Sequence, residues 1–342
     1  MRAIYFNEHG GPEVLRFGDL PTPEPKLGEA LIRVRAVALN HLDIWVRRGW
    51  RGLSLQMPHI SGSDVVGEVV KVNANSSWIP GQRVMINPGI VSRPDEWTER
   101  GEDSVSPNYR ILGEHSAGGL AEFVCVPIQN VFTAPDGLND EEVAASLLVG
   151  TTCWRMLFKQ GKLHAGETVL VVGSGGGVNS LAISMAVSAG AQVITLCGNA
   201  EKMKKAKALG AHEVIDYNKN PNWPSEVLRM TKGLGADLVV DNVGADTFNK
   251  SLRAVARAGR IVTVGNTSGY NIRFDNRILF SKQVSLIGST MGSKQDFLAA
   301  INFMLQQKIK PVIDVVSDLG SGIDLLQKLE NGQHFGKIVL KP

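Results

Sequence analysis

The second half of the chain alternates between two patterns of hydrophobic and polar positions. Short runs rich in Val, Ile and Leu show no polar alternation, which is typical of strands covered by helices on both faces. Six such runs predict strands at 168–173, 192–198, 213–217, 237–244, 260–265 and 284–290. The stretches between them have helical composition, at 179–191, 201–211, 223–236, 246–259 and 276–283. This order predicts an α/β fold with a doubly wound, parallel, six-stranded sheet, the architecture that binds dinucleotides.

The first 125 residues follow a different pattern. Strand-like segments such as 29–40 and 64–72 are interrupted by clusters of Pro and Gly, which indicates a compact β-barrel. A helix at 294–308 and two apolar runs follow the parallel sheet, and we expect this tail to pack on the barrel. The predicted domains are a catalytic domain, residues 1–149 and 290–342, and a nucleotide-binding domain, residues 150–289.

Charge and cysteine usage narrow the class of protein. The 342 residues carry a formal charge of only +3, evenly spread, which argues against a nucleic-acid partner. Cys125, Cys153 and Cys197 have no paired spacing, so we expect no disulfide framework and a reducing, cytoplasmic setting. The N-terminal residues are strand-like rather than a secretory signal, and no apolar run is long enough to span a bilayer. We therefore expect a small-molecule substrate and no membrane partner.

A glycine-rich loop follows the first predicted strand of the sheet and opens its first helix. Glycines at such a place let the backbone approach a pyrophosphate, which then lies at the helix N-terminus. The usual spacing of three glycines fails, because Ser174 and Asn179 stand at the two outer positions and only Gly176 is kept. A glycine-rich turn between any strand and helix is the alternative. The residues predicted to cradle the cofactor are Ser174, Gly175, Gly176, Gly177, Val178 and Asn179.

With these features, the sequence resembles the medium-chain dehydrogenase/reductase superfamily, which comprises zinc alcohol dehydrogenases and zinc-free quinone oxidoreductases. The resemblance extends over essentially the whole chain. It implies a GroES-like β-barrel catalytic domain and a Rossmann domain. The segments that carry it are 38–49, 61–72, 118–123, 173–179 and 205–217.

The charged segment 91–110 is the lobe that holds a structural zinc in the zinc-containing members. Those members have four cysteines there, separated by two, two and seven residues, whereas this chain has Ser92, Asp95, Thr98 and Ser106. We therefore predict a lobe without its metal. The sequence leaves open whether pairing of arginines with acidic residues orders the lobe, whether it is mobile, or whether a subunit interface holds it.

The ligands of the catalytic zinc are missing as well. The resemblance places these ligand positions at Asn40, Ser63 and Leu148, so no metal is predicted. His41 and His59 are interpreted as structural residues, and His41 is expected to lie in a strand-like segment. Asp64 matches an acidic residue beside the metal and is expected to bond to Asn40 or Arg48.

An enzyme of this family without a catalytic zinc is better suited to reducing quinones or enones than to oxidising alcohols. Alcohol oxidation requires removal of the hydroxyl proton, which zinc promotes by lowering the pKa of a bound oxygen. A quinone or an enone needs only hydrogen-bond donors for the developing oxyanion. The resemblance gives Asn40 as such a donor and Thr152 as a nicotinamide contact, and it places Arg51 where some relatives have a tyrosine acid. The catalytic residues predicted are therefore Asn40, Thr152 and Arg51.

The cofactor predicted is NADP(H), with NAD(H) possible. NAD-specific Rossmann domains place an acid at the end of the second strand, where this chain has Cys197. The resemblance gives Lys202 and Tyr217 as contacts of the 2′-phosphate, and Asn199 can donate a hydrogen bond there. The set predicted to bind the cofactor is completed by Gly244, Gly265, Asn266 and Lys337.

The sequence thus predicts a zinc-independent, NADPH-dependent oxidoreductase acting on a quinone, an enone or a related carbonyl. One alternative is an alcohol dehydrogenase-like enzyme with another alcohol or aldehyde as substrate. A second is a non-catalytic NADPH-binding protein with a crystallin-like or regulatory role. The strand predicted at 284–290 ends the sheet and leaves an unpaired edge, so we also expect a homodimer or a tetramer.

Overall fold

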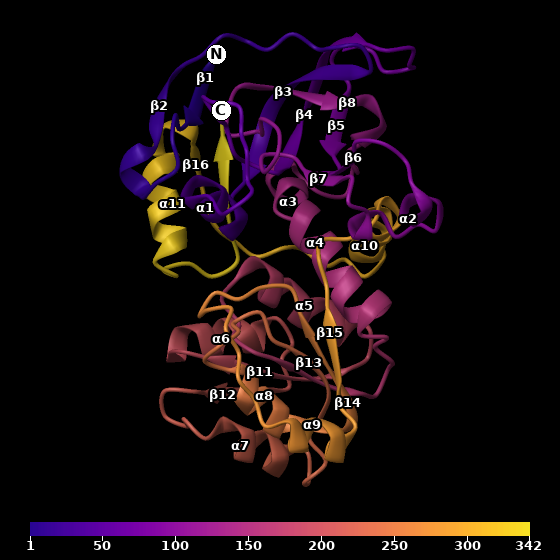
Figure 1. Ribbon diagram of the computed structural model, residues 1–342, viewed down its shortest axis with the longest axis vertical. Coiled ribbons are helices and arrows are strands. Elements are labelled where there is room, and N and C mark those ends of the chain that lie inside the picture. The colour runs from indigo at the N-terminus through magenta and orange to yellow at the C-terminus, as the bar shows by residue number, and fades with distance from the viewer. The chain divides into compact units, whose positions relative to one another are not determined.

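The computed structural model describes all residues, 1–342, and the chain divides into two compact units (Figure 1). The first unit contains residues 1–149, 293–301 and 310–342, and the second contains residues 150–292 and 302–309. The structure therefore assigns the last part of the helix α10 (Lys294–Gln306) to the second unit. No helix in the structure is both long and apolar enough to cross a membrane.

The first unit is built on a β-sheet whose central strand is β3 (Glu29–Ala38). The order is β16-β17-β3-β4-β5-β9, and β8 also pairs with β3. In β3, the pattern of apolar and polar positions places Ala30, Ile32 and Val34 in the core and leaves Arg33 and Arg35 exposed. The other strands of the unit are β1 (Arg2–Tyr5), β2 (Arg16–Asp19), β4 (Asp64–Asn73), β5 (Arg83–Ile86), β6 (Gly89–Val91), β7 (Tyr109–Ile111), β8 (Phe123–Pro127) and β9 (Val131–Thr133). The GroES-like β domain is thus confirmed.

The C-terminal tail completes this sheet. Strands β16 (Ile313–Asp318) and β17 (Lys337–Lys341) pair in parallel, and β17 pairs antiparallel with the end of β3. Helix α11 (Gly322–Glu330) lies between them in the chain. The tail therefore brings Lys337, at the start of β17, close to the residues that follow β3.

The second unit contains a parallel sheet of six strands in the order β12-β11-β10-β13-β14-β15. This is the doubly wound order, so the predicted Rossmann fold is confirmed. The strands are β10 (Thr168–Val171), β11 (Gln192–Cys197), β12 (Glu213–Asp216), β13 (Ala236–Val240), β14 (Val255–Thr263) and β15 (Ser285–Gly288). The helices that follow them are α5 (Gly177–Ser188), α6 (Ala200–Ala208), α7 (Trp223–Met230), α8 (Phe248–Ala254) and α9 (Asn276–Lys282).

The largest differences from the predicted boundaries in this unit concern the helices expected at 223–236 and 246–259. The first ends at Met230, and β13 begins at Ala236. Residues 255–259 were expected to be helical, but β14 begins at Val255. Val255 is fully buried and pairs with Ala236, and the register shifts before the main ladder starts at Arg260. The backbone of Ala258 has a φ of 57°, which a helix does not allow. Pairing with β13 therefore overrides the local helical composition.

The lobe 91–110 is ordered by a hydrogen-bond network centred on one carboxylate. Oδ1 of Asp95 accepts bonds from the amides of Trp97 and Thr98 at 3.0 and 3.1 Å, so Asp95 caps α2 (Glu96–Glu99). Its Oδ2 accepts bonds from Ser106 Oγ at 2.5 Å and Asn108 Nδ2 at 3.0 Å. One anion with four donors thus connects three of the four positions that carry thiolates in the zinc-containing members, and Ser92 Oγ donates to the carbonyl of Asn108.

Exposed arginines contribute less to the lobe than this network. Arg100 pairs with Glu96 at 3.3 Å, as the sequence allowed, but both side chains are well exposed. Arg93 donates to Asn108 rather than to an acid. Asp103 accepts a bond from the amide of Lys294, which attaches the lobe to the start of α10.

Candidate active site

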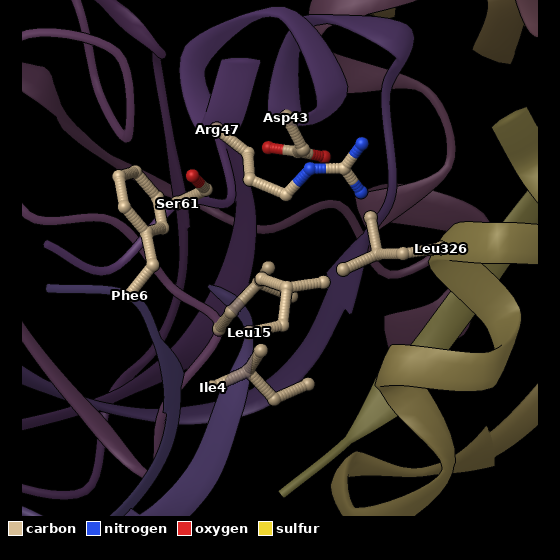
Figure 2. Close-up of a pocket in the computed structure, with 8 residues that line it drawn as sticks. Ile4, Phe6, Leu15, Asp43, Arg47, Ser61 and Leu326 are labelled. Atoms are coloured by element: carbon tan, nitrogen blue, oxygen red, sulfur yellow. The ribbon is translucent and has the colours of Figure 1, made fainter. Parts of the chain in front are cut away.

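The helix α1 (His41–Arg48) begins immediately after β3 and is fixed at its N-terminus by Asp43, whose carboxyl group is drawn in Figure 2. Oδ2 of Asp43 accepts a bond from the amide of Asn40 at 2.7 Å, and Oδ1 accepts one from the amide of Gly62 at 3.0 Å. An acid three residues after the N-cap is a known helix start signal. The strand expected around His41 is therefore wrong: the imidazole lies on the first turn of a helix and packs edge-on against Trp45, with 5.0 Å between ring centroids.

Asn40, Asp64 and Lys337 form a buried polar cluster. The Asn40 Nδ2 donates to Asp64 Oδ2 at 2.9 Å, which confirms the predicted contact between these two residues. The ammonium of Lys337 donates to Asn40 Oδ1 at 2.6 Å and to Asp64 Oδ2 at 2.9 Å. The other Asp64 oxygen accepts a bond from the amide of Leu148 at 2.7 Å. Every polar atom of the Asp64 and Asn40 side chains therefore has a partner.

The charges in this cluster are almost completely shielded from water. Asp64 is 0% exposed and Lys337 is 3% exposed. A buried carboxylate is stable only with a cation and hydrogen bonds around it, and Lys337 supplies the cation. Nearby, burial raises the pKa of Asp43 to about 6, although the amides of Asn40 and Gly62 and the Lys337 charge oppose this shift.

The residues at the ligand positions of the catalytic metal do not suit zinc. The amide oxygen of Asn40 already accepts the Lys337 ammonium, and the side chain of Leu148 has no donor atom for a metal. The hydroxyl of Ser63 is fully buried and has no partner in the chain, but a lone hydroxyl is a poor zinc ligand. No group of three or more His, Cys, Asp or Glu is arranged to hold a metal ion. In the lobe, the oxygen atoms at the ligand positions of the structural metal are already engaged in the hydrogen bonds around Asp95.

Neither of the other two predicted catalytic residues is hydrogen-bonded to this cluster. Arg51 is exposed in the turn after α1 and makes no hydrogen bond or ion pair with the cluster. Thr152 belongs to the second unit, in α4 (Leu147–Trp154), where it is 3% exposed and its Oγ1 donates to Met291 Sδ at 3.7 Å. His59 is structural, as expected: its Nε2 lies 3.1 Å from the carbonyl of Gly113, and its ring packs on Phe6.

In the second unit, the two residues that replace glycine in the fingerprint hold the loop in place. Oγ of Ser174 lies 3.1 Å from Sγ of Cys197, at the end of β11. Nδ2 of Asn179 donates to the carbonyls of Val172 and Gly173 at 2.9 and 3.1 Å. Oδ1 of Asn179 accepts a bond from Asn242, a residue that the sequence analysis did not single out. Asn242 in turn accepts a bond from the amide of Val264, so one chain of amides joins the loops after β10, β13 and β14.

The glycine loop has room for a phosphate. The helix α5 starts after Gly176, which has no side chain to cap the first amides. A Cβ built on Gly176 would meet nothing within 4 Å, so the chain itself leaves this space open. Amides at a helix N-terminus with open space in front of them suit a pyrophosphate. The residues Ser174–Asn179 therefore fit the group that the resemblance implies.

The loops after β13 and β14 lie at the same edge of the sheet. Gly244 has a φ of 98°, and a Cβ there would stand 2.6 Å from the carbonyl oxygen of Gly269, so only glycine is accommodated. The amide of Ser268 donates to the carbonyl of Val243. The predicted residues Gly265 and Asn266 lie in this second loop. Carboxyl ends of parallel strands are where ligands of such sheets bind, which fits the predicted nicotinamide side.

The end of β11 carries the residues predicted to select the cofactor. Asn199 caps α6, because its Oδ1 accepts a bond from the amide of Lys202 at 2.8 Å. Tyr217 is 43% exposed, and its hydroxyl lies over Gly198, where a Cβ would be only 2.4 Å away. Asp216 pairs with Cys197 in the ladder, and its Oδ1 accepts bonds from amides of its own turn.

Comparison with known proteins agrees with both halves of this description. The model of the alcohol dehydrogenase GroES-like domain matches residues 26–136, and the model of the zinc-binding dehydrogenase family matches residues 177–306. An NAD-dependent alcohol dehydrogenase of Sulfurisphaera tokodaii is 30% identical over the full length of both chains. The chain belongs to the medium-chain dehydrogenase/reductase superfamily.

Other members of the superfamily resemble the chain to similar extents. A crystal structure of an NAD-dependent alcohol dehydrogenase superposes over 100% of both chains with a TM-score of 0.95 and 42% identity. A crotonyl-CoA reductase of Streptomyces avermitilis is 29% identical over 95% of this chain and 81% of its own length. As a medium-chain dehydrogenase/reductase, the protein is an NAD(P)-dependent oxidoreductase.

Proposed function

We propose that this protein is a zinc-independent, NADPH-dependent oxidoreductase that transfers hydride to a quinone, an enone or a related carbonyl compound. The proposal depends on the buried cluster at the ligand positions of the missing metal. Asn40 stands at the first of these positions, where the zinc-containing members have a cysteine, and both its amide and the Lys337 ammonium bond to Asp64. Both N–H groups of the Asn40 side chain are engaged within the chain, so the cluster offers a ligand the third N–H and the positive charge of Lys337.

These groups suit carbonyl reduction better than alcohol oxidation. A hydroxyl must lose its proton before hydride leaves its carbon, and nothing in the cluster lowers the pKa of a bound alcohol as a metal would. An enone or a quinone accepts hydride at carbon, and the developing negative charge on its oxygen is stabilised by hydrogen-bond donors. The Lys337 ammonium has three N–H groups and uses two of them within the cluster, so one donor remains for a ligand.

The reaction is balanced without a further reactant besides water. A nicotinamide cofactor held by the glycine loop of the second unit would supply the hydride. For an enone, the hydride adds to the β-carbon, the electrons of the double bond move toward the carbonyl oxygen, and an enolate forms. The remaining N–H of Lys337 stabilises that oxygen, and a proton from water then adds at the α-carbon. For a quinone, transfer of one hydride and net addition of one proton give the hydroquinone, with tautomerisation where the hydride adds to carbon.

Among relatives, the crotonyl-CoA reductase supports an unsaturated carbonyl substrate. The name of that enzyme denotes reduction of an α,β-unsaturated thioester. That relative spans nearly the whole of this chain, so both predicted domains take part in the match.

The proposed preference for NADPH rests on the residues at the end of β11. Cys197 stands where NAD-specific members have an acid that would repel a 2′-phosphate. Lys202, on the first turn of α6, supplies a positive charge near the same end of the strand. A charge-assisted contact with a phosphate contributes about 1.5–3 kcal/mol.

Replacement of this lysine tests the cofactor assignment. We expect Lys202→Ala to raise the KM for NADPH by about 10- to 150-fold, the equivalent of that contact, and to leave the KM for NADH nearly unchanged. The matched control is Lys204→Ala, an exposed lysine of the same helix. Steady-state kinetics with both cofactors measure the effect. Equal changes for NADPH and NADH, or a wild-type preference for NADH, would contradict the assignment.

A second candidate function is supported by the names of other relatives. The structure that is 42% identical and the Sulfurisphaera relative are both described as NAD-dependent alcohol dehydrogenases. An alcohol or aldehyde substrate is therefore the alternative for this chain, with the buried cluster taking over the part of the metal.

One set of measurements distinguishes these functions. The purified protein is analysed for zinc and then assayed with NADPH against quinones and enones, and with NAD⁺ or NADP⁺ against alcohols, with and without a chelator. We expect no stoichiometric zinc, oxidation of NADPH by quinones or enones, and no effect of the chelator. One zinc per chain with chelator-sensitive turnover would reject the mechanism. Turnover of alcohols alone would favour the second candidate, and no turnover with any acceptor would favour a cofactor-binding role.

A further inference from the structure

Two asparagines connect three loops at the carboxyl edge of the parallel sheet. Asn179 stands after β10, where the usual fingerprint has its last glycine, and Asn242 stands in the loop after β13. Nδ2 of Asn242 donates to Oδ1 of Asn179 at 3.1 Å, and Oδ1 of Asn242 accepts a bond from the amide of Val264 at 2.9 Å. Val264 directly follows β14 and begins the loop that contains Gly265 and Asn266.

The orientation of both amide groups is determined by their partners. The backbone N–H of Val264 can only donate, so Asn242 turns its oxygen toward Val264 and its nitrogen toward Asn179. Asn179 then presents its oxygen to Asn242, and its nitrogen donates to the carbonyls of Val172 and Gly173 at 2.9 and 3.1 Å. Reversal of either amide would break bonds at both of its ends. The two side chains therefore form one connected link.

The link lies on one side of the place where such a sheet binds a dinucleotide. In the order β12-β11-β10-β13-β14-β15, the direction of the connections reverses between β10 and β13, and ligands bind in the crevice at this switch point. The residues predicted to select the cofactor, such as Lys202, follow β11 on one side of β10. The link runs to the other side, from β10 to β13 and β14. It therefore joins the pyrophosphate cradle to the predicted nicotinamide loop and does not reach the adenosine side.

We propose that Asn179 and Asn242 are positioning residues that hold the nicotinamide half of the cofactor in place relative to its pyrophosphate. Backbone bonds, such as that from Ser268 to Val243, connect the loops after β13 and β14 to each other. The bond between the two asparagines connects both of these loops to the glycine loop. The inference rests on the NAD(P) dependence of the family and not on the proposed substrate or the preference for NADPH.

Calorimetric titration of the whole chain tests the proposal, with the dinucleotide that the wild type binds, NADPH or NADH, and with its adenosine half, 2′,5′-ADP or 5′-AMP. For Asn242→Ala, we expect the Kd of the dinucleotide to rise about 2- to 10-fold, the equivalent of one hydrogen bond, and the Kd of the adenosine half to stay unchanged. The matched control is Asn249→Ala, which loses a bond to the carbonyl of Arg273 in the same unit but leaves the link intact, and both Kd values should stay unchanged. Equal weakening of dinucleotide and adenosine half in Asn242→Ala, or an unchanged Kd of the dinucleotide, would overturn the proposal.

A second variant tests whether the two asparagines act as one link and keeps the proposal testable if Asn242→Ala does not fold. Asn179→Gly restores the glycine of the usual fingerprint and removes the partner of Asn242. We expect it to weaken binding of the dinucleotide as Asn242→Ala does, and the double variant to bind no more weakly than the weaker single variant. Hydrogen exchange at the amide of Val264 should be faster in Asn179→Gly, although that amide bonds only to Asn242. Additive losses of affinity, or unchanged exchange at Val264 in Asn179→Gly, would show that the asparagines do not act together.

Discussion

At the scale of single residues, Lys337 has a role that its sequence neighbourhood does not suggest. It lies 297 residues after Asn40 and is the cation that balances the buried Asp64. The sequence analysis placed it among the cofactor contacts, and that remains a prediction. Its ammonium is bonded to the cluster at the ligand positions of the missing metal, so a single side chain connects the tail of the chain with the candidate active site.

Removal of this lysine should strongly destabilise the first unit. Lys337→Met leaves the Asp64 carboxylate buried without a cation, and we expect the free energy of unfolding to fall by about 3–5 kcal/mol. The control is Lys341→Met, which breaks an exposed pair with Glu141 and should cost about 0–1 kcal/mol. Denaturation by urea measures both. If Asp64→Asn does not restore part of the lost stability in the double variant, the unpaired charge is not the cause.

The carboxyl group of Asp43 should give the stability of the protein a measurable dependence on pH. Burial raises its pKa from 3.8 to about 6, so between these values the folded state binds the proton more tightly than the unfolded state does. The free energy of unfolding of the wild type, relative to Asp43→Asn, should therefore decrease as the pH rises through this window. The change is on the order of 2–3 kcal/mol. Parallel curves for the two proteins would show that Asp43 does not titrate there.

At the scale of elements, the lobe 91–110 shows how a loop without a core is ordered when its metal ligands are lost. In the zinc-containing members, one cation gathers four anions. In this chain one anion, Asp95, gathers four donors, and hydrogen bonds to its carboxylate hold its pKa below the usual value. The carboxylate is therefore ionised at neutral pH, and the lobe should lose this support only in acid, as the pH falls below 3.8.

Substitution of Asp95 should loosen the lobe without changing the rest of the fold. In Asp95→Asn, the amide group cannot accept all four bonds, so we expect faster cleavage by trypsin at Arg100 and faster hydrogen exchange of the lobe amides. Glu99→Gln is the control, because it changes the charge equally in the same lobe and Glu99 holds no comparable network. Equal protease sensitivity of Asp95→Asn and the wild type would contradict the role given to the network.

At the scale of the whole molecule, the edge of the parallel sheet predicts self-association. Strand β15 pairs only with β14, and Leu286 on it is 37% exposed. An unprotected edge strand invites pairing with a second copy. We expect light scattering to show at least twice the chain mass of 36.9 kDa, and Leu286→Glu to lower that mass. A monomer at micromolar concentration would contradict the prediction.

The sequence by itself determined the type and order of the secondary-structure elements. Short, unbroken apolar runs rich in β-branched residues, such as 168–173, are typical of strands buried on both faces, and the regular helical stretches between them leave a parallel sheet as the consistent arrangement. Local signals were sufficient because each element is specified by residues close together in the chain. The boundary at Val255 was missed, because there a contact with a strand some twenty residues earlier overrides local composition.

The tertiary structure alone decided how polar groups far apart in the chain satisfy one another. Nothing near Lys337 in the sequence indicates that its ammonium meets Asn40 and Asp64, because the contact depends on β17 pairing with β3. The same is true of Asn242, which links the glycine loop to the loop after β14. A polar side chain that is removed from water must form hydrogen bonds, because leaving it unpaired is costly. Its partners are determined by the tertiary structure, because only the packed chain decides which donors and acceptors lie within reach.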